Sequence, residues 1–141
     1  MLRANSLVAK IARKPQLSTD MRAPSIHLED DEVLMLVDSG ATIHASWIEK
    51  LFPAYKDKIV ESTAQRRGET ATTAGGQALK CEGRCTLNLE AHGMNIAVNT
   101  NNMRVDIPIL SVRRLVKDGY SVAFEEDGGY ICQRGTNNTV R

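Results

Sequence analysis

Residues 32–46 read Glu-Val-Leu-Met-Leu-Val-Asp-Ser-Gly-Ala-Thr-Ile-His-Ala-Ser, and this stretch decides the fold. The apolar run 33–37 is too short for an independent helix and predicts a strand buried on both faces. An acid and three small residues follow directly: Asp38, Ser39, Gly40 and Ala41. A serine hydroxyl can hydrogen-bond to nearby groups, and a glycine lets the backbone pack close to a carboxylate. The stretch therefore predicts a carboxylate held where a buried strand turns into a tight loop.

The tripeptide Asp-Ser-Gly is also what an ordinary strand-ending turn contains. With the hydrophobic strand before it and Ala-Thr after it, the segment resembles the active-site segment of retropepsin-like aspartic proteases, especially the copia-type (gag-pol) retrotransposon proteases with Asp-Ser-Gly-Ala. The resemblance implies that Asp38 is catalytic and that Ser39, Gly40 and Ala41 form the active-site loop. It also implies a mainly β fold, a retropepsin-like closed β-barrel (the acid protease fold) with a flap hairpin and one short C-terminal helix. His44, further along the same loop, is interpreted as structural or solvent-exposed.

A glycine-tipped β-hairpin is predicted within residues 69–90. Its first arm covers residues 70–73, its tip residues 74–77, and its second arm runs from Ala78 to Leu89. The hairpin resembles the flap that folds over the substrate in retropepsins, and copia-type chains carry a similar Ala-x-Gly tip. The substrate-binding residues that this resemblance implies are Ala74, Gly75 and Gly76.

One part of the copia-type pattern differs in this chain. The Gly-x-Gly stretch that follows the flap tip in those proteases reads Gly83-Arg84-Cys85 here. A zinc-binding β domain that uses Cys81, Cys85 and His92 is a weaker alternative. Because their spacing matches no common zinc module and small buried thiols explain the cysteines, we predict no metal and no cofactor.

The second informative stretch precedes a predicted short helix. Ser111 can cap this helix, and Gly119 ends it. A strand over residues 120–124 and a hairpin turn at 127–129 follow. The order resembles the second half of a retropepsin, where a hydrophobic pair and a glycine cross behind the catalytic loop. Serine replaces that glycine here, which departs from the retroviral pattern but resembles copia-type chains with Leu-Leu-Ser-Val. The crossing residues that this resemblance implies are Ile109, Leu110 and Ser111.

The other segments give coarser expectations. Residues 46–49 have the spacing of a capping box that opens a short helix. Residues 55–68 are polar and predict a loop with one short strand, around residues 59–60. Two further short strands are predicted at 94–98 and 103–107, on either side of a polar turn.

The chain divides into three predicted parts. Residues 1–30 form a basic leader with no acid before Asp20, either disordered, a mitochondrial targeting segment or the relic of a longer polyprotein. Residues 31–133 form the retropepsin-like protease domain, and residues 134–141 form a polar tail.

Composition limits the partners. The chain has 141 residues, enough for one domain with a modest core, and its formal net charge of +1 argues against direct nucleic-acid binding or a membrane surface. No transmembrane span is present in the sequence. The odd number of cysteines, 3, does not form a disulfide framework and favours a reducing, intracellular location, in the cytoplasm unless residues 1–30 direct the chain to mitochondria.

Peptide hydrolysis by carboxylates needs one group to accept a proton from water and another to protonate the amide oxygen. The sequence contains a single acid directly after a buried strand, and the chain is too short for two full lobes. The resemblance therefore implies a homodimer in which each chain contributes Asp38, acting on an extended peptide or polyprotein substrate. The alternative is a catalytically inactive retropepsin-like module that dimerises or binds peptides.

Overall fold

The computed structural model describes residues 5–11, 31–73, 75–91, 93–126, 128–135 and 139–140, and these are mainly β, as predicted. The first half contains β1 (Asn5–Ile11), β2 (Glu32–Asp38), β3 (Ala45–Ser46), α1 (Ile48–Leu51), the 3-10 helix η1 (Pro53–Lys58), α2 (Thr63–Arg66), β4 (Thr70–Thr72) and β5 (Ala78–Lys80). The second half contains β6 (Arg84–Ala91), β7 (Met94–Asn102), β8 (Ile109–Ser111), α3 (Val112–Lys117), β9 (Tyr120–Glu125), β10 (Gly128–Gln133) and β11 (Thr139–Val140).

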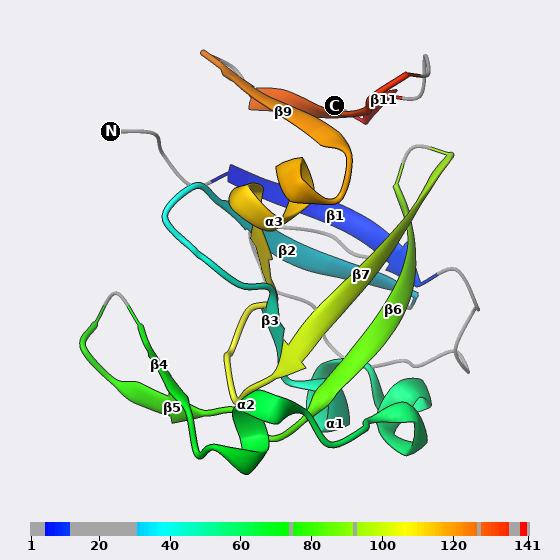
Figure 1. Cartoon of the computed structure of the whole chain (residues 1–141). Helices are drawn as coiled ribbons and strands as arrows, with labels where there is room; N and C mark the ends of the chain where they lie inside the picture. Colours follow the sequence, from blue (N-terminus) through cyan, green and yellow to red (C-terminus); the bar gives the residue numbers. More distant parts are fainter. Residues whose placement is uncertain are drawn as a thin grey trace.

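The central sheet pairs its strands in the order β1-β2-β8-β3-β7-β6, and β1 also pairs with β6, so the order closes on itself (Figure 1). Two of the strand pairings in this sheet involve few residues. Strands β3 and β8 share one residue pair, Ala45 with Ile109, and β1 meets β6 through two pairs, Lys10 with Glu90 and Ile11 with Leu89. The long β6–β7 hairpin and the β1–β2 pair therefore supply most of the hydrogen bonds of this sheet.

The main core lies inside this sheet. Strands β6 and β7 alternate buried and exposed residues, as expected for strands with one face toward a core and the other toward solvent. Strand β2 buries Met35 and Val37 fully but leaves Leu34 and Leu36 half-buried, so the prediction that both faces are buried is only partly met. The largest fully buried side chains of this core include Phe52, Leu87, Leu89, Ile96, Leu110 and Leu115. Each contributes about 1.5–3 kcal/mol by leaving water.

Strand β1 corrects the predicted domain boundary. Residues 5–11 were assigned to a leader outside the domain, but their backbone pairs with β2 along its whole length, from Asn5 with Val37 to Lys10 with Glu32. The basic composition of residues 1–30 gave no indication of this strand, which pairs with β2 on one side and with β6 on the other. The rest of the predicted leader, residues 1–4 and 12–30, lies outside the described residues.

Two strand predictions were wrong. The predicted turn at 99–102 and strand at 103–107 are replaced by a single β7 that continues to Asn102, after which the chain is irregular. The predicted second arm of the flap breaks after Lys80, and β6 pairs with β7 instead of with β4. The break coincides with Gly83, whose φ of 105° belongs to the left-handed region and cannot continue a strand.

Short helices occur at both predicted places, α1 and α3, and the structure adds η1 and α2. Helix α3 lies where expected, with the Ser111 side chain accepting a hydrogen bond from the Arg114 N–H (3.2 Å) as its N-cap. The turns α1, η1 and α2 occupy residues 48–66, most of which were predicted as a loop. Ser46 does not cap α1, because it belongs to β3 and Trp47 precedes the helix without a side-chain hydrogen bond.

A separate three-stranded sheet, β11-β10-β9, lies at the top of the view in Figure 1, beyond α3. Strands β9 and β10 pair as the predicted last hairpin, but Gly128 and Gly129 belong to β10 and not to the turn, and Asp127 lies outside the described residues. Strand β11 lies in the predicted polar tail and pairs with β10. None of the helices in the described residues is long and apolar enough to span a membrane.

Candidate active site

Asp38 is the last residue of β2, at the point where the strand leaves the sheet. Its Oδ1 accepts a hydrogen bond from the Gly40 N–H (2.8 Å), so the loop folds back onto the carboxylate. A Cβ on Gly40 would lie 3.3 Å from the same oxygen, tighter than an ordinary contact. The small residue predicted at this position therefore has a steric reason: it leaves room for the backbone to approach the carboxylate.

Strand β8 supports the loop from behind. It runs parallel to β2, with Leu36 opposite Ile109, Val37 opposite Leu110 and Asp38 opposite Ser111. The Ser111 hydroxyl donates a hydrogen bond to the Ala41 carbonyl oxygen (2.7 Å), which joins the loop to the start of α3. Ile109, Leu110 and Ser111 therefore lie next to the strand that ends in Asp38. Their functional role remains a prediction.

His44 connects the same elements. Its Nδ1 accepts a hydrogen bond from the Ser111 N–H (3.0 Å), and its carbonyl oxygen accepts from the Asn101 N–H (3.0 Å). The side chain is buried, with 2% of its surface exposed. Burial lowers the pKa of His44 to about 4, Asp118 opposes the shift, and Arg114 adds to it. The ring is therefore neutral near pH 7, and it is a structural part of the loop, one of the two roles considered for it.

A cleft of about 740 Å³ lies in front of Asp38. The loop after β2 forms one wall of the cleft through Asp38, Gly40 and Ala41. Leu36 and Ile109 line the cleft from the two parallel strands. The opposite wall comes from the β4–β5 hairpin, and Figure 1 shows this hairpin and the loop after β2 on the same side of the molecule. The cleft thus brings together the carboxylate and the hairpin that the sequence suggested as a flap.

The hairpin itself is short. Strands β4 and β5 share three residue pairs, from Thr70 with Lys80 to Thr72 with Ala78. At the tip, the Thr73 N–H donates to the Gln77 carbonyl oxygen (2.8 Å), and Gly76 has a φ of 86°. Such a φ favours glycine over any side chain.

The predicted flap residues are only partly described. Gly75 and Gly76 are exposed at the tip and do not line the cleft, while Ala74 lies outside the described residues. Cys85, the residue that departs from the copia-type pattern, lies in β6 and is buried in the main core, outside the hairpin.

Several cleft residues were not identified from the sequence. They are Leu36, Thr42, Ile43, Ala45, Ala64, Glu69, Thr70, Ala71, Thr72, Thr73, Leu79, Cys81, Asn101, Met103 and Val105. The alternation of apolar and polar residues in the predicted hairpin was the one sequence signal for the hairpin residues that face the cleft. Nothing in the sequence indicated Met103 and Val105, because they lie in an irregular segment after β7.

The cysteines do not assemble a metal site in the part of the chain that is described. The Cys81 Sγ lies 3.6 Å from the Ser62 Oγ and 3.4 Å from the Gly83 carbonyl oxygen, while burial raises the pKa of Cys85. No group of three or more potential metal ligands occurs among the described residues, and His92 lies outside them. The zinc alternative therefore gains no support.

No protein-family model, no curated protein and no solved structure matches this chain.

Proposed function

We propose that the chain is an aspartic endopeptidase of the retrotransposon, retropepsin-like type, active as a homodimer on an extended peptide or polyprotein. One observation carries the proposal: Asp38 ends a strand that lies parallel to β8, receives a hydrogen bond from Gly40, and faces a cleft of about 740 Å³ opposite the β4–β5 hairpin. These features supply one of the two carboxylates that peptide hydrolysis needs, together with a hairpin that can cover a bound peptide.

A dimer follows from the number of carboxylates. Two close carboxyl groups share one proton, because like charges about 3 Å apart do not both ionise readily. The cleft contains a second acid, Glu69, but this residue precedes β4 and its carboxylate lies 3.9 Å from Arg67. A second copy related by a twofold axis supplies the missing partner as another Asp38.

In this mechanism the two Asp38 carboxylates act as general base and general acid and exchange roles during turnover. Their two titrations belong to the pair and not to either residue. Ser39 hydrogen-bonds beside the carboxylates, and Gly40 permits their approach. The β4–β5 hairpin closes over the peptide, pairs with its backbone and excludes water.

The test is cleavage of a mixed peptide library between about pH 4 and pH 7 by wild type, Asp38→Asn and Asp57→Asn. Asp57 is an exposed residue of η1 and serves as the matched control. We expect Asp38→Asn to lose activity by about 10³-fold, because the general base and acid are both removed from the dimer, while Asp57→Asn retains it. Wild-type activity should rise faster than linearly with protein concentration.

Two results would contradict the proposal in different ways. Activity linear in protein concentration and abolished by Glu69→Gln indicates a single-chain pair of Asp38 with Glu69. Equal and negligible activity of wild type and Asp38→Asn, in protein shown to be folded and dimeric, indicates the inactive peptide-binding module.

We also propose that the protein is located in the cytoplasm, a reducing compartment, because its three cysteines, all of which lie in the described residues, form no disulfide.

A further inference from the structure

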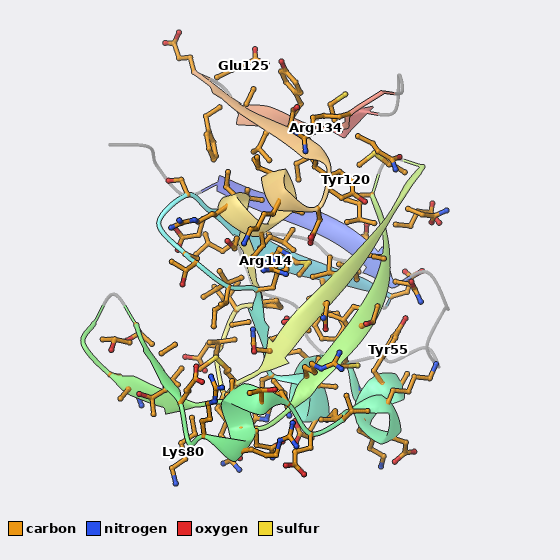
Figure 2. The ribbon with its side chains drawn as sticks, in the orientation of Figure 1. Tyr55, Lys80, Arg114, Tyr120, Glu125 and Arg134 are labelled. Carbon is orange, nitrogen blue, oxygen red and sulfur yellow. The ribbon has the colours of Figure 1, made fainter. Side chains whose placement is uncertain are left out.

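A second, smaller pocket of about 210 Å³ lies beside the catalytic loop. Three parts of the chain form it: the loop through Ile43 and His44, the β6–β7 hairpin through Arg84 and Asn101, and α3 through Arg114. Figure 2 shows Arg114 below α3, on the side of the helix toward the middle of the molecule. The proposed catalysis assigns no role to this pocket.

His44, one of the residues that line the pocket, has a buried side-chain nitrogen without a partner among the described residues. Because the Nδ1 of His44 accepts from the Ser111 N–H, the neutral ring carries its proton on Nε2. This Nε2 is buried, and it has no hydrogen-bond partner in the described structure. A buried polar group left unpaired is costly, so a ligand that accepts from it is favoured.

The pocket is also positively charged. Arg84 and Arg114 are among its lining residues, and none of the lining residues is acidic. Neither arginine forms an ion pair with any described residue, in contrast to Arg66, Arg67 and Arg104. Asp118, whose charge raises the pKa of His44 against the effect of burial, does not line the pocket.

The pocket is adjacent to the larger cleft. Ile43 and Asn101 line both, so one pair of residues separates the space in front of Asp38 from the pocket. A peptide that lies along the cleft therefore contacts residues that also line the pocket with the two arginines.

From these observations we propose that this pocket is a specificity subsite that binds the carboxylate side chain of an Asp or Glu in the peptide substrate, away from the bond that is cut. The carboxylate accepts from His44 Nε2–H and from the guanidinium groups of Arg84 and Arg114, which suit a planar acceptor. This inference rests on the proposed peptide-binding cleft and adds the class of side chain that the cleft selects.

The first experiment measures selectivity. The full chain is incubated with an octapeptide library, and cleaved products are sequenced for wild type, Arg114→Ala and Arg113→Ala. Arg113 is the matched control, because it is the exposed neighbour in α3 and does not line the pocket. We expect about a tenfold preference for Glu over Gln at one position in wild type and Arg113→Ala, falling to about twofold or less in Arg114→Ala.

The second experiment does not need cleavage. N-acetyl-glutamate amide and N-acetyl-glutamine amide are each titrated into wild type while the His44 Nε2 and Arg114 Nε resonances are followed by NMR. Shifts of both resonances with the glutamate compound alone support the site. If the same protein cleaves no peptide, the proposed activity fails but the carboxylate-binding site is still supported.

The inference is overturned by cleavage without any acidic preference, by a preference that Arg114→Ala leaves intact, or by equal shifts with both compounds. In protein without activity, absence of shifts overturns it as well. Inorganic phosphate that shifts the same resonances while the glutamate compound does not assigns the pocket to a free anion and also overturns it.

Discussion

The loop at residues 38–44 and the β4–β5 hairpin line the same cleft, yet different contacts hold them in place. The loop is fixed by hydrogen bonds from Gly40 to Asp38, from Ser111 to Ala41 and from Ser111 to His44, over a fully buried Leu110. The hairpin has three residue pairs and mostly exposed residues. The difference teaches which side of the cleft is positioned in advance and which side can move.

Glycine has a different purpose in each region. Gly40 has no unusual φ, but a Cβ there would crowd the Asp38 carboxylate. Gly76 has open space around it, but its φ of 86° disfavours other residues. One glycine allows close packing, and the other allows a turn.

Truncation of a leucine on each side is the strongest test of this contrast. Leu110→Ala should lower the free energy of unfolding by about 3–4 kcal/mol, because it leaves a cavity beneath the loop. Leu79→Ala in the half-buried hairpin should cost about 1 kcal/mol, since its site can collapse. Urea unfolding monitored by circular dichroism measures both. Equal costs would mean that the hairpin is packed as firmly as the loop.

The second-largest effect expected is a loss of folding stability at acidic pH, caused by His44 at the end of the loop. His44 takes up a proton near pH 6.5 in the unfolded chain but only near pH 4 in the folded one. Between these values the unfolded state binds more protons, so the free energy of unfolding falls as the pH falls, by up to about 3 kcal/mol. At pH 7 this stability is fully present.

The check is urea unfolding at several pH values for wild type and His44→Gln, which retains the other histidines. We expect a shallower pH dependence in the variant. An identical slope would show that His44 does not resist protonation, and a peptidase assay at pH 4 would then need no correction for unfolded protein.

The smallest expected effect is on the hairpin tip. Gly76→Ala should cost about 1 kcal/mol, because an alanine at this φ is strained. Gly40→Ala should instead reduce peptidase activity more than stability, since the strain falls on the carboxylate. Parallel unfolding and cleavage assays of the two variants distinguish these outcomes. A reversal of the two effects would contradict the division of roles between the two regions.

The sequence predicted both halves of the loop side but not how they meet. Val33–Val37 and the following acid indicated β2, and Ser111 indicated the start of α3. The parallel register of Asp38 with Ser111 is a long-range pairing that no local pattern specifies. Only the resemblance to retropepsins suggested that they lie together.

The incorrect prediction of a turn at residues 99–102 followed from relying on local residue preferences. Asparagines at 99, 101 and 102 favour a turn, yet β7 runs through them. The side chains of Asn101 and Asn102 hydrogen-bond to groups in other segments of the chain. The Asn102 Oδ1 accepts from the Ile48 N–H (3.0 Å), and its Nδ2 donates to the Glu82 carbonyl oxygen (3.3 Å). Tertiary contacts of this kind override propensity and cannot be seen in a sequence.

The pairing of β1 with β2 affects how the protein can be produced. Strand β2 has β8 on one side and β1 on the other, so a chain cut back to begin at residue 31 leaves one edge of β2 without partners. Exposed edges of apolar strands recruit other chains and aggregate. Insoluble protein from such a shortened gene would reflect the lost edge cover, and it would carry no information about whether Asp38 cleaves peptides.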